Sequence, residues 1–417
     1  MTDSTSMRFE LMPIRLPVLW TFAGLVGGLL VGMLLSGSAV VDDIIAWTRP
    51  VGILWLRALQ MTIIPLVAAL LVLGIVQLVS AARAGAAARR MLILVFAVLI
   101  AGGVITAAIL PWLLNIFPVP GSASAFLTGT PQEAQQVPEL ADFVASLVAP
   151  NIIAAAAETA MLPLTIFFAL FAVAITRLPK DQSVSLLNFF HALANAMLQI
   201  IGWVLWLAPI GVFALAIGVA ARAGGGAFAA LVHYILLVSA MGGFVLIGAY
   251  LLAWTVGGIS PWRFAKAVLP AQAVAVSTQS SLASLPAMLD SSERLKLRQS
   301  SSEFVLPLAV AIFRATSPAM NLAVAIYVAH LAGIELSPAL MAAGIGVALI
   351  ISIGSVSLPG SISFVVSIGP IAIAMGVPVE PLALLVAVEM LPDIMRTLAN
   401  VTMNVAVTSA VDRVQRD

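Results

Sequence analysis

Five polar residues near the end of the chain recur at helical spacing in an otherwise apolar segment. In VEMLPDIMRTLANVTMN, residues 388–404, Glu389, Asp393, Arg396, Asn400 and Asn404 follow one another at intervals of three or four. On an α-helix this spacing places them on one face, over about 22 Å at 1.5 Å per residue. A charge facing lipid costs at least about 2.5 kcal/mol. The stripe is therefore predicted to face a protein interior.

The chemistry of this stripe suits a small charged ligand. The planar guanidinium of Arg396 can bind a carboxylate through two hydrogen bonds, and Asp393 can accept from an ammonium group. Together they favour a zwitterion that carries an additional acid. A purely structural Asp393–Arg396 pair is the plainer alternative, but it leaves the other polar positions unexplained.

The amino-acid composition indicates that the whole chain is a membrane protein. Of 417 residues, 62% are hydrophobic and 9% are charged, against roughly a quarter charged in an ordinary globular domain. Segments long enough to cross a bilayer, which takes about 20 residues, recur along the chain. We expect an all-α membrane protein with eight transmembrane helices, at 16–36, 51–79, 91–117, 151–176, 195–221, 228–256, 304–333 and 379–411.

Charge between the spans predicts their orientation. Basic residues cluster at alternate connections: Arg8, Arg15, Arg83, Arg89, Arg90, Arg177, Lys180, Arg263, Lys266, Arg413 and Arg416. Asp42, Asp43 and the segment 118–139 fall on the other side. By the positive-inside rule both termini are expected in the cytoplasm, in a bacterial inner (plasma) membrane. The net charge of +1 gives no reason to expect nucleic acid as a partner, and the absence of cysteine excludes thiolate metal sites and redox chemistry.

Two apolar segments in the second half of the chain are interrupted in the middle. SSLASLP at 280–286 and SIGSVSLPGS at 352–361 each contain a Ser-Leu-Pro. Proline removes a helical hydrogen bond, and serine and glycine loosen the turn. Such a pair in corresponding positions is typical of inverted repeats whose half-helices meet at a substrate site. We expect two re-entrant helical hairpins; two kinked ordinary spans are the alternative.

Several motifs together resemble a known family. They are MTIIPLV at 61–67, MLPLTIFFALFAVAIT at 161–176, APIGVFAL at 208–215, the two serine-rich hairpins and DIMRTLANVT at 393–402. In this order and spacing they resemble the dicarboxylate/amino acid:cation symporters, the glutamate transporter family. The resemblance implies a homotrimer with an elevator mechanism. Residues 13–90 and 118–225 would form the scaffold, and 91–117 and 226–412 the mobile transport domain.

The resemblance also assigns a substrate site. It implies Asp393 for the amino group, Arg396 for the side-chain carboxylate, and Ser317, Thr397 and Asn400 for other polar contacts. Ser281 would contribute from the first hairpin tip. A backbone lid at 354–360, including Ser357, Pro359 and Gly360, would close the site from the second hairpin.

One motif departs from the family. Where the family carries Asn-Met-Asp-Gly-Thr, this chain has Phe313, Arg314, Ala315, Thr316 and Ser317, and Asn404 stands for another aspartate. Sodium prefers several oxygen ligands, so sodium dependence is predicted to be lost or reduced. A site made of backbone carbonyls could persist. Arg314 would serve as a fixed internal cation in place of sodium; the alternative is an arginine that reaches toward the cytoplasm.

A proton is the remaining coupling ion, because burial disfavours an ionised carboxylate. Glu389 is the preferred carrier, since substrate ammonium neutralises Asp393. We therefore expect a secondary active transporter for acidic amino acids or dicarboxylates, coupled to protons or acting as an exchanger. A sodium-coupled dicarboxylate or neutral amino-acid symporter and an anion-conducting channel are the alternatives. No H-E-x-x-H or G-x-S-x-G motif indicates an enzyme, and no cofactor is expected. His191, His233 and His330 are expected to be packing or interface residues.

Overall fold

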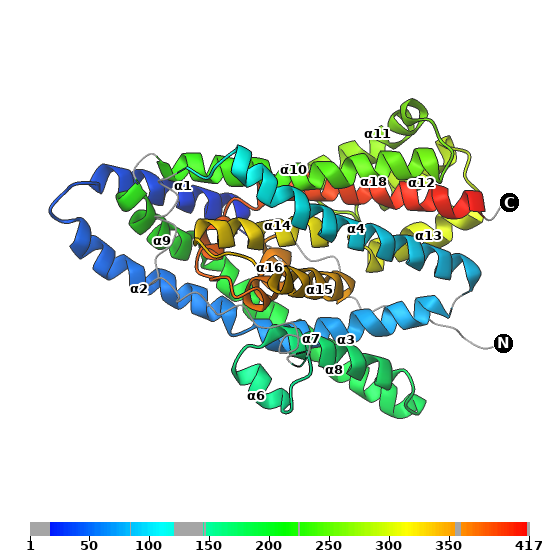
Figure 1. The fold of residues 1–417 in the computed structure, drawn as a ribbon, viewed down its shortest axis with the longest axis horizontal. Coiled ribbons are helices and arrows are strands. Elements are labelled where there is room, and N and C mark those ends of the chain that lie inside the picture. Colours follow the sequence, from blue (N-terminus) through cyan, green and yellow to red (C-terminus); the bar gives the residue numbers. More distant parts are fainter. Residues whose placement is uncertain are drawn as a thin grey trace.

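The described part of the chain consists of helices joined by turns and short connections. The computed structural model describes residues 17–83, 85–120, 145, 147–223, 226–354 and 360–414, and these contain no β-strand. Figure 1 shows the arrangement. In chain order the helices are α1 (Val18–Leu35), α2 (Val41–Gln60), α3 (Ile63–Ala82), α4 (Ala86–Ile116), α6 (Ile152–Ala157), α7 (Met161–Ile175), α8 (Lys180–Trp206), α9 (Ala208–Ala223), α10 (Gly226–Thr255), α11 (Pro261–Thr278), α12 (Leu285–Arg294), α13 (Gln299–Ile312), α14 (Thr316–Leu331), α15 (Pro338–Gly354), α16 (Gly360–Ala374), α17 (Leu382–Leu385) and α18 (Met390–Val414).

Long apolar helices confirm a membrane architecture, while the count of eight spans stays a prediction. Among the described residues, five helical stretches have the length and composition to cross a bilayer, and four shorter apolar helices accompany them. The long stretches are Val41–Ala82, Ala86–Ile116, Lys180–Trp206, Gly226–Thr255 and Gln299–Leu331.

Two predicted spans differ from the helices of the structure. The segment predicted at 51–79 forms parts of two helices, α2 from Val41 and α3 from Ile63, so Asp42 and Asp43 lie in the first turn of α2 instead of in a connection. Carboxylates are favourable there because a helix N-terminus carries partial positive charge. The span placed at 195–221 is divided at Leu207, where α8 ends and α9 begins.

The span predicted at 304–333 also forms as two helices. α13 ends at Ile312 and α14 begins at Thr316, with Phe313 in an extended conformation between them. Pro318 lies in the first turn of α14, where its missing N–H costs no intrahelical hydrogen bond. The break therefore leaves backbone groups of 313–315 outside a regular helix, in the middle of the span.

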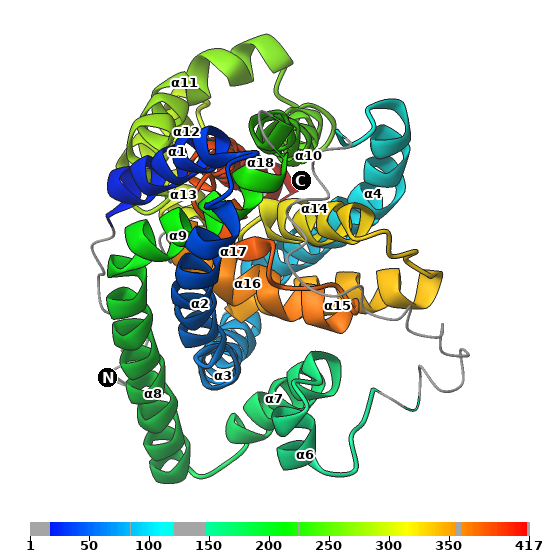
Figure 2. The same cartoon turned by 90° about the vertical axis from the view of Figure 1, so that its left-hand side faces the viewer.

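Both interrupted segments fold as helix pairs. α11 packs on α12, and α15 packs on α16. At the first tip Gln279 adopts the left-handed conformation, with φ of 50°, and Ser284 donates a hydrogen bond to the carbonyl oxygen of Ser280. The second tip, 355–359, lies outside the described residues. Figure 2 shows α15 and α16 between α14 and α3, and each of the two contacts both of those helices.

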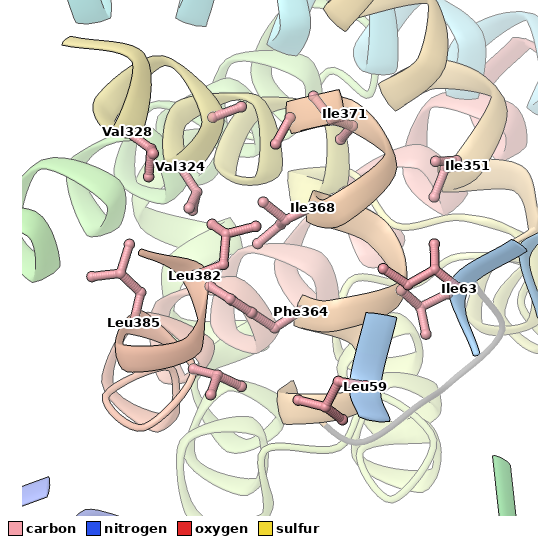
Figure 3. Close-up of a cluster of buried hydrophobic side chains, with 14 of the residues drawn as sticks. Leu59, Ile63, Val324, Val328, Ile351, Phe364, Ile368, Ile371, Leu382 and Leu385 are labelled. Carbon is pink, nitrogen blue, oxygen red and sulfur yellow. The ribbon is translucent and has the colours of Figure 1, made fainter. Parts of the chain in front are cut away.

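Apolar packing holds the second pair in place. Phe364 and Ile368 of α16 belong to a buried cluster with Val324 of α14, Leu382 of α17 and Ile63 of α3, as Figure 3 shows. Elsewhere, Gly24, Gly28 and Gly32 of α1 lie so close to the α9 backbone that an added Cβ would collide with it. Small residues four apart permit such close helix contacts in membranes.

The C-terminal end of α18 contacts the segments that connect other helices. Asp412 is 1% exposed and accepts hydrogen bonds from Arg298 Nε and Ser301 Oγ, both at 2.8 Å. Gly258, in the connection after α10, lies against the guanidinium of Arg413. In Figure 1 the turn between α3 and α4 lies at this same end of the molecule. The basic connection between α3 and α4 and the C-terminal end of α18 thus lie at the same end of the molecule.

Candidate functional site

The polar stripe is buried, as its charges require. Asp393, Arg396, Thr397, Asn400 and Asn404 lie on α18, and Glu389 lies in the turn that directly precedes it. Each of these side chains belongs to a residue at most 6% exposed. α18 packs against α10, α11, α13 and α14. The stripe therefore faces protein, and the charges are shielded from lipid.

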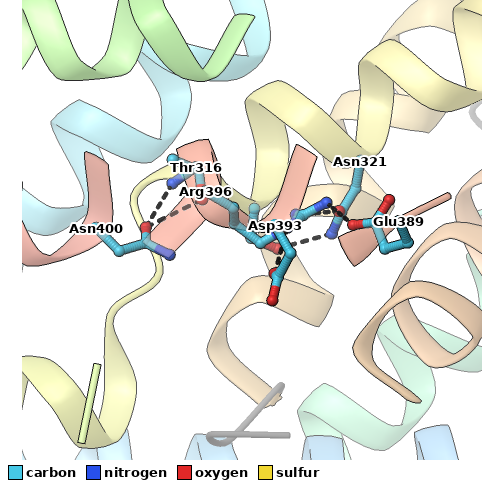
Figure 4. A network of polar contacts seen from close by, with 7 residues as sticks. Thr316, Asn321, Glu389, Asp393, Arg396 and Asn400 are labelled. Carbon is cyan, nitrogen blue, oxygen red and sulfur yellow. Dashed lines mark hydrogen bonds and ion pairs between the residues drawn. The ribbon is translucent and has the colours of Figure 1, made fainter. Parts of the chain in front are cut away.

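Arg396 is the centre of this cluster. Its Nη2 donates to Glu389 Oε1 at 2.7 Å and its Nη1 donates to Asn321 Oδ1 at 2.7 Å. Its Nε lies 3.3 Å from Asp393 Oδ1. Figure 4 shows these groups converging from α14, α18 and the turn before α18. Every nitrogen of the guanidinium thus faces an oxygen supplied by the protein itself.

α14 is joined to this cluster at its first turns. Asn400 Oδ1 accepts hydrogen bonds from the backbone N–H and the hydroxyl of Thr316, each at 3.0 Å. It therefore satisfies one of the N–H groups that a helix start leaves without an intrahelical partner. One turn further on, Asn321 Nδ2 donates to Ser317 Oγ at 3.0 Å. The helix break and the stripe are held in one rigid polar network.

Arg314 extends the charges of the site. It lies in the break between α13 and α14 and is half-buried. Asp393 interacts electrostatically with both Arg396 and Arg314. The two carboxylates, Glu389 and Asp393, are thereby matched by two guanidinium groups, and their formal charges cancel.

Some buried polar atoms in this region have no hydrogen-bond partner within the described residues. They are Glu389 Oε2, Tyr234 Oη, Arg396 Nε and both amide atoms of Asn404. Buried polar groups are nearly always paired, so each such atom requires an explanation. Glu389 and Asn404 are the two ends of the stripe, Arg396 Nε keeps only its ion-pair contact with Asp393, and Tyr234 lies on α10.

The structure brings most of the predicted residues together. Ser317 and Thr397 are buried beside Arg396 and Asn400 along the network, and Ser281 is half-buried at the tip between α11 and α12. Gly360 is the first residue of α16. Ser357 and Pro359 lie outside the described residues.

Two residues escaped the sequence reasoning. Asn321 binds Arg396, and Tyr234 places an unpaired hydroxyl in range of Glu389. Asn321 did carry a signal, because it is the only amide in the apolar sequence of α14. Tyr234 carried none, since an aromatic residue in a membrane helix is ordinarily a packing residue.

No metal-binding cluster is present in the part of the chain that the structure describes: no three His, Asp or Glu side chains are grouped to hold an ion. Phe313 and Ala315, in the break between α13 and α14, are 2% and 1% exposed and offer no side-chain oxygen. Any cation held here would depend on backbone carbonyls.

Comparison with known proteins decides the family. The model of the sodium:dicarboxylate symporter family matches residues 18–414. The chain belongs to this family. The resemblance seen in the sequence motifs is confirmed, and the sodium:dicarboxylate symporters are membrane transporters, which supports a transporter and not an enzyme.

Individual relatives cover most of the chain. The proton/sodium-glutamate symport protein of Bacillus subtilis strain 168 is 27% identical over 392 residues, 92% of this chain and 89% of that protein. The proton/glutamate-aspartate symporter of Escherichia coli strain K12 is 28% identical over 406 residues, 94% of this chain and 91% of that protein. The C4-dicarboxylate transport protein of Laribacter hongkongensis is 24% identical over 375 residues, covering 87% and 82%.

Proposed function

We propose that this symporter carries acidic amino acids, aspartate or glutamate, across a bacterial inner membrane, with protons in place of sodium as the coupling ion. Arg396 beside Asp393 supplies the pair of charges that such a substrate needs. The names of two relatives, a proton/glutamate-aspartate symporter and a proton/sodium-glutamate symport protein, agree with this substrate class.

The ion pair between Arg396 and Glu389 carries the proposal. At 2.7 Å, with both side chains nearly inaccessible, Glu389 occupies the guanidinium edge that a substrate carboxylate would use. Substrate must therefore displace Glu389 from Arg396. A buried carboxylate that loses its cation cannot stay ionised at low cost. Glu389 accordingly takes up a proton as the substrate carboxylate binds, and loses it when Arg396 is free again.

The other residues then have distinct roles. Asp393 accepts from the substrate ammonium group, and Asn321 holds Nη1 of Arg396 so that the opposite edge stays oriented. Thr397, Asn400 and Ser317 line the polar face, with Ser281 at the first hairpin tip. The second tip, with Ser357, Pro359 and Gly360, forms the lid.

Arg314 and Asn404 replace the sodium chemistry. Arg314 supplies a fixed positive charge in range of Asp393, which a bound cation would otherwise provide. Asn404 replaces a carboxylate by a neutral amide, so its end of the stripe needs no counter-ion. With Arg314 positively charged and Asn404 neutral, the formal charges of the site cancel before substrate binds. Sodium is then not needed to neutralise the site during transport.

Movement follows the family pattern in this proposal. α4, α10 to α16 and α18, within 91–117 and 226–412, form a transport domain, and 13–90 and 118–225 form the scaffold of a homotrimer that works as an elevator, with both termini in the cytoplasm. The close glycine contact of α1 with α9 supports a rigid scaffold. The packing of α10, α11, α13 and α14 around α18 supports a carrier unit that moves with the site.

Plain C4-dicarboxylates are the second candidate, favoured by the dicarboxylate transporter among the relatives. Asp393 separates the two, because a substrate without an ammonium group would leave this carboxylate without its partner. In competition for uptake, an affinity for aspartate at least tenfold higher than that for succinate would support the amino-acid assignment. This ratio corresponds to a difference in binding free energy on the order of 1.4 kcal/mol.

Uptake into proteoliposomes tests the function. Labelled aspartate is supplied with a proton gradient alone, a sodium gradient alone, or neither. We expect accumulation with the proton gradient and none with sodium. Accumulation that strictly requires sodium would refute the proposed coupling, and large currents without substrate would indicate a channel.

A further inference from the structure

A short chain of polar contacts leads from the far end of α4 toward the site. His233 of α10 is half-buried, and its Nε2 lies 2.9 Å from the carbonyl oxygen of Phe117, which follows α4 and is 56% exposed. Its Nδ1 lies 3.1 Å from Tyr327 Oη of α14. Tyr327 Oη also lies 3.2 Å from the carbonyl oxygen of Ala230.

These distances satisfy two protonation states of His233. A carbonyl oxygen only accepts, so Nε2 carries a hydrogen in either state. In neutral His233, Nδ1 accepts from the hydroxyl of Tyr327. In charged His233, Nδ1–H donates to Tyr327 Oη, and the tyrosine hydroxyl turns to the carbonyl of Ala230. One added proton thus redirects one hydroxyl, and every group keeps a partner.

The neighbouring tyrosine continues the chain inward. Tyr234 packs edge-on against Tyr327, with ring centroids 5.4 Å apart. Its hydroxyl is fully buried, has no partner within the described residues, and interacts electrostatically with Glu389. Glu389 Oε2 is likewise without a partner, while Oε1 is held by Arg396. Both oxygens can therefore still take part in a further hydrogen bond.

Resting on the proposed function, we propose that His233, Tyr327 and Tyr234 form the route by which the coupling proton reaches Glu389. His233 takes up the proton beside the exposed end of α4, because an imidazole ring can both accept and donate a proton. It passes its Nδ1 proton to Tyr327 as that hydroxyl gives its own proton to a water molecule. Because Tyr234 Oη and Glu389 Oε2 have no hydrogen-bond partner within the described residues, water bridges Tyr327 to Tyr234 and Tyr234 to Glu389. Each bridging oxygen accepts one proton and gives up one, Glu389 Oε2 gains one proton, and His233 returns to neutral.

The groups around both ends are few. Glu389 faces Arg396 and Asp393 of α18 and Tyr234 of α10, and Arg314 acts on it through Asp393. His233 faces Tyr327 of α14 and the end of α4. The relay therefore joins the C-terminal end of α4, through α10 and α14, to the turn before α18.

Two variants test the route in proteoliposomes. Tyr234→Phe removes only a hydroxyl and keeps the ring contact, and His233→Gln removes the titratable group. Each should slow proton-driven aspartate uptake by about tenfold or more. Aspartate binding and exchange of aspartate for aspartate, which need no net proton movement, should stay within about twofold of the unmodified protein. Tyr250→Phe, on the same helix, and His191→Gln are the matched controls.

The outcomes separate the route from the function. Normal proton-driven uptake in both variants overturns the route and leaves Glu389 as carrier. If the unmodified protein ignores a proton gradient, both proposals fall. Nitrogen NMR of labelled histidine, in a His191→Gln, His330→Gln background, gives a second test. We expect Nε2–H alone at high pH and both nitrogens protonated at low pH; an Nδ1–H tautomer at high pH would contradict the relay.

Discussion

The two ends of the polar stripe differ in how they are satisfied. Around Arg396, guanidinium, carboxylates and an amide contact one another within 3.3 Å. Eight residues further along α18, about 12 Å at 1.5 Å per residue, Asn404 is 1% exposed and neither of its amide atoms has a partner within the described residues. At the Arg396 end the charged side chains contact one another within the protein, whereas the Asn404 end is uncharged.

The difference follows from what each kind of buried group costs without a partner. A buried carboxylate without a cation would cost several kcal/mol, whereas an unpaired amide costs about 1–3 kcal/mol. Asparagine at position 404 is therefore tolerable where aspartate would need an ion. At the Arg396 end the charged side chains balance one another.

The largest effect should come from breaking the organised end. Arg396→Ala leaves Glu389 and Asp393 without their common cation and removes the carboxylate-binding fork. Removing one partner of a buried, hydrogen-bonded charge pair costs about 2–5 kcal/mol, so aspartate affinity should fall by roughly a hundredfold or more. Isothermal titration in detergent measures it.

A matched control is available at the surface. Arg294→Ala breaks the pair with Asp290, in which both side chains are about half exposed. Exposed pairs contribute little, so its affinity should equal that of the unmodified protein. Aspartate binding that survives in Arg396→Ala would sink the assignment of the site.

The second effect concerns protons. Because substrate displaces Glu389, which then takes up a proton, aspartate affinity should weaken as pH rises, by up to about tenfold per pH unit. Glu389→Gln keeps the shape but carries no charge, so its affinity should be independent of pH and proton-driven accumulation should disappear. Glu303→Gln, at an exposed glutamate bonded to Gln299, is the control. If aspartate affinity in Glu389→Gln depends on pH as it does in the unmodified protein, a group other than Glu389 takes up the proton.

The sequence alone predicted the burial of this stripe but not its internal pairing. Its spacing and the cost of charge in lipid require a protein-facing helix surface, and Asp393 next to Arg396 follows from one helical turn. Glu389 pairs with Arg396 across seven residues, from a turn before α18 begins. That contact depends on the exact path of the turn, which spacing does not contain.

Contacts between segments that are distant in the chain were also not predicted from the sequence. Asn321 reaches Arg396 from a residue 75 positions away, and Thr316 reaches Asn400 from 84 positions away. Both depend on the helix break at 313–315, for which Ser317-Pro318 was a usable signal of a helix start. His233 seemed a packing residue, because its partners Tyr327 and Phe117 are near it only in the folded chain.

A smaller effect is expected from the charge that links the two ends. Arg314→Met leaves the two carboxylates with a single guanidinium. Aspartate affinity should fall by about tenfold, roughly 1.4 kcal/mol, and added sodium should partly restore it. Arg314→Lys keeps the charge and should bind nearly normally. Equal affinity for all three proteins, with or without sodium, would mean that Arg314 plays no part in the site.

The smallest effect should come from the unpaired amide. Asn404→Leu replaces a buried polar side chain by an apolar one of similar size, which relieves unpaired polar atoms and leaves stability unchanged or raised by up to about 1 kcal/mol. Thermal unfolding in detergent should show an equal or slightly higher Tm, with proton-driven uptake retained. Asn404→Asp is the informative partner, because it returns a charge to a buried position that lacks a cation. We expect that variant to be less stable than Asn404→Leu, and to recover stability in sodium; loss of uptake in Asn404→Leu would instead show that the amide binds an ion or water needed for transport.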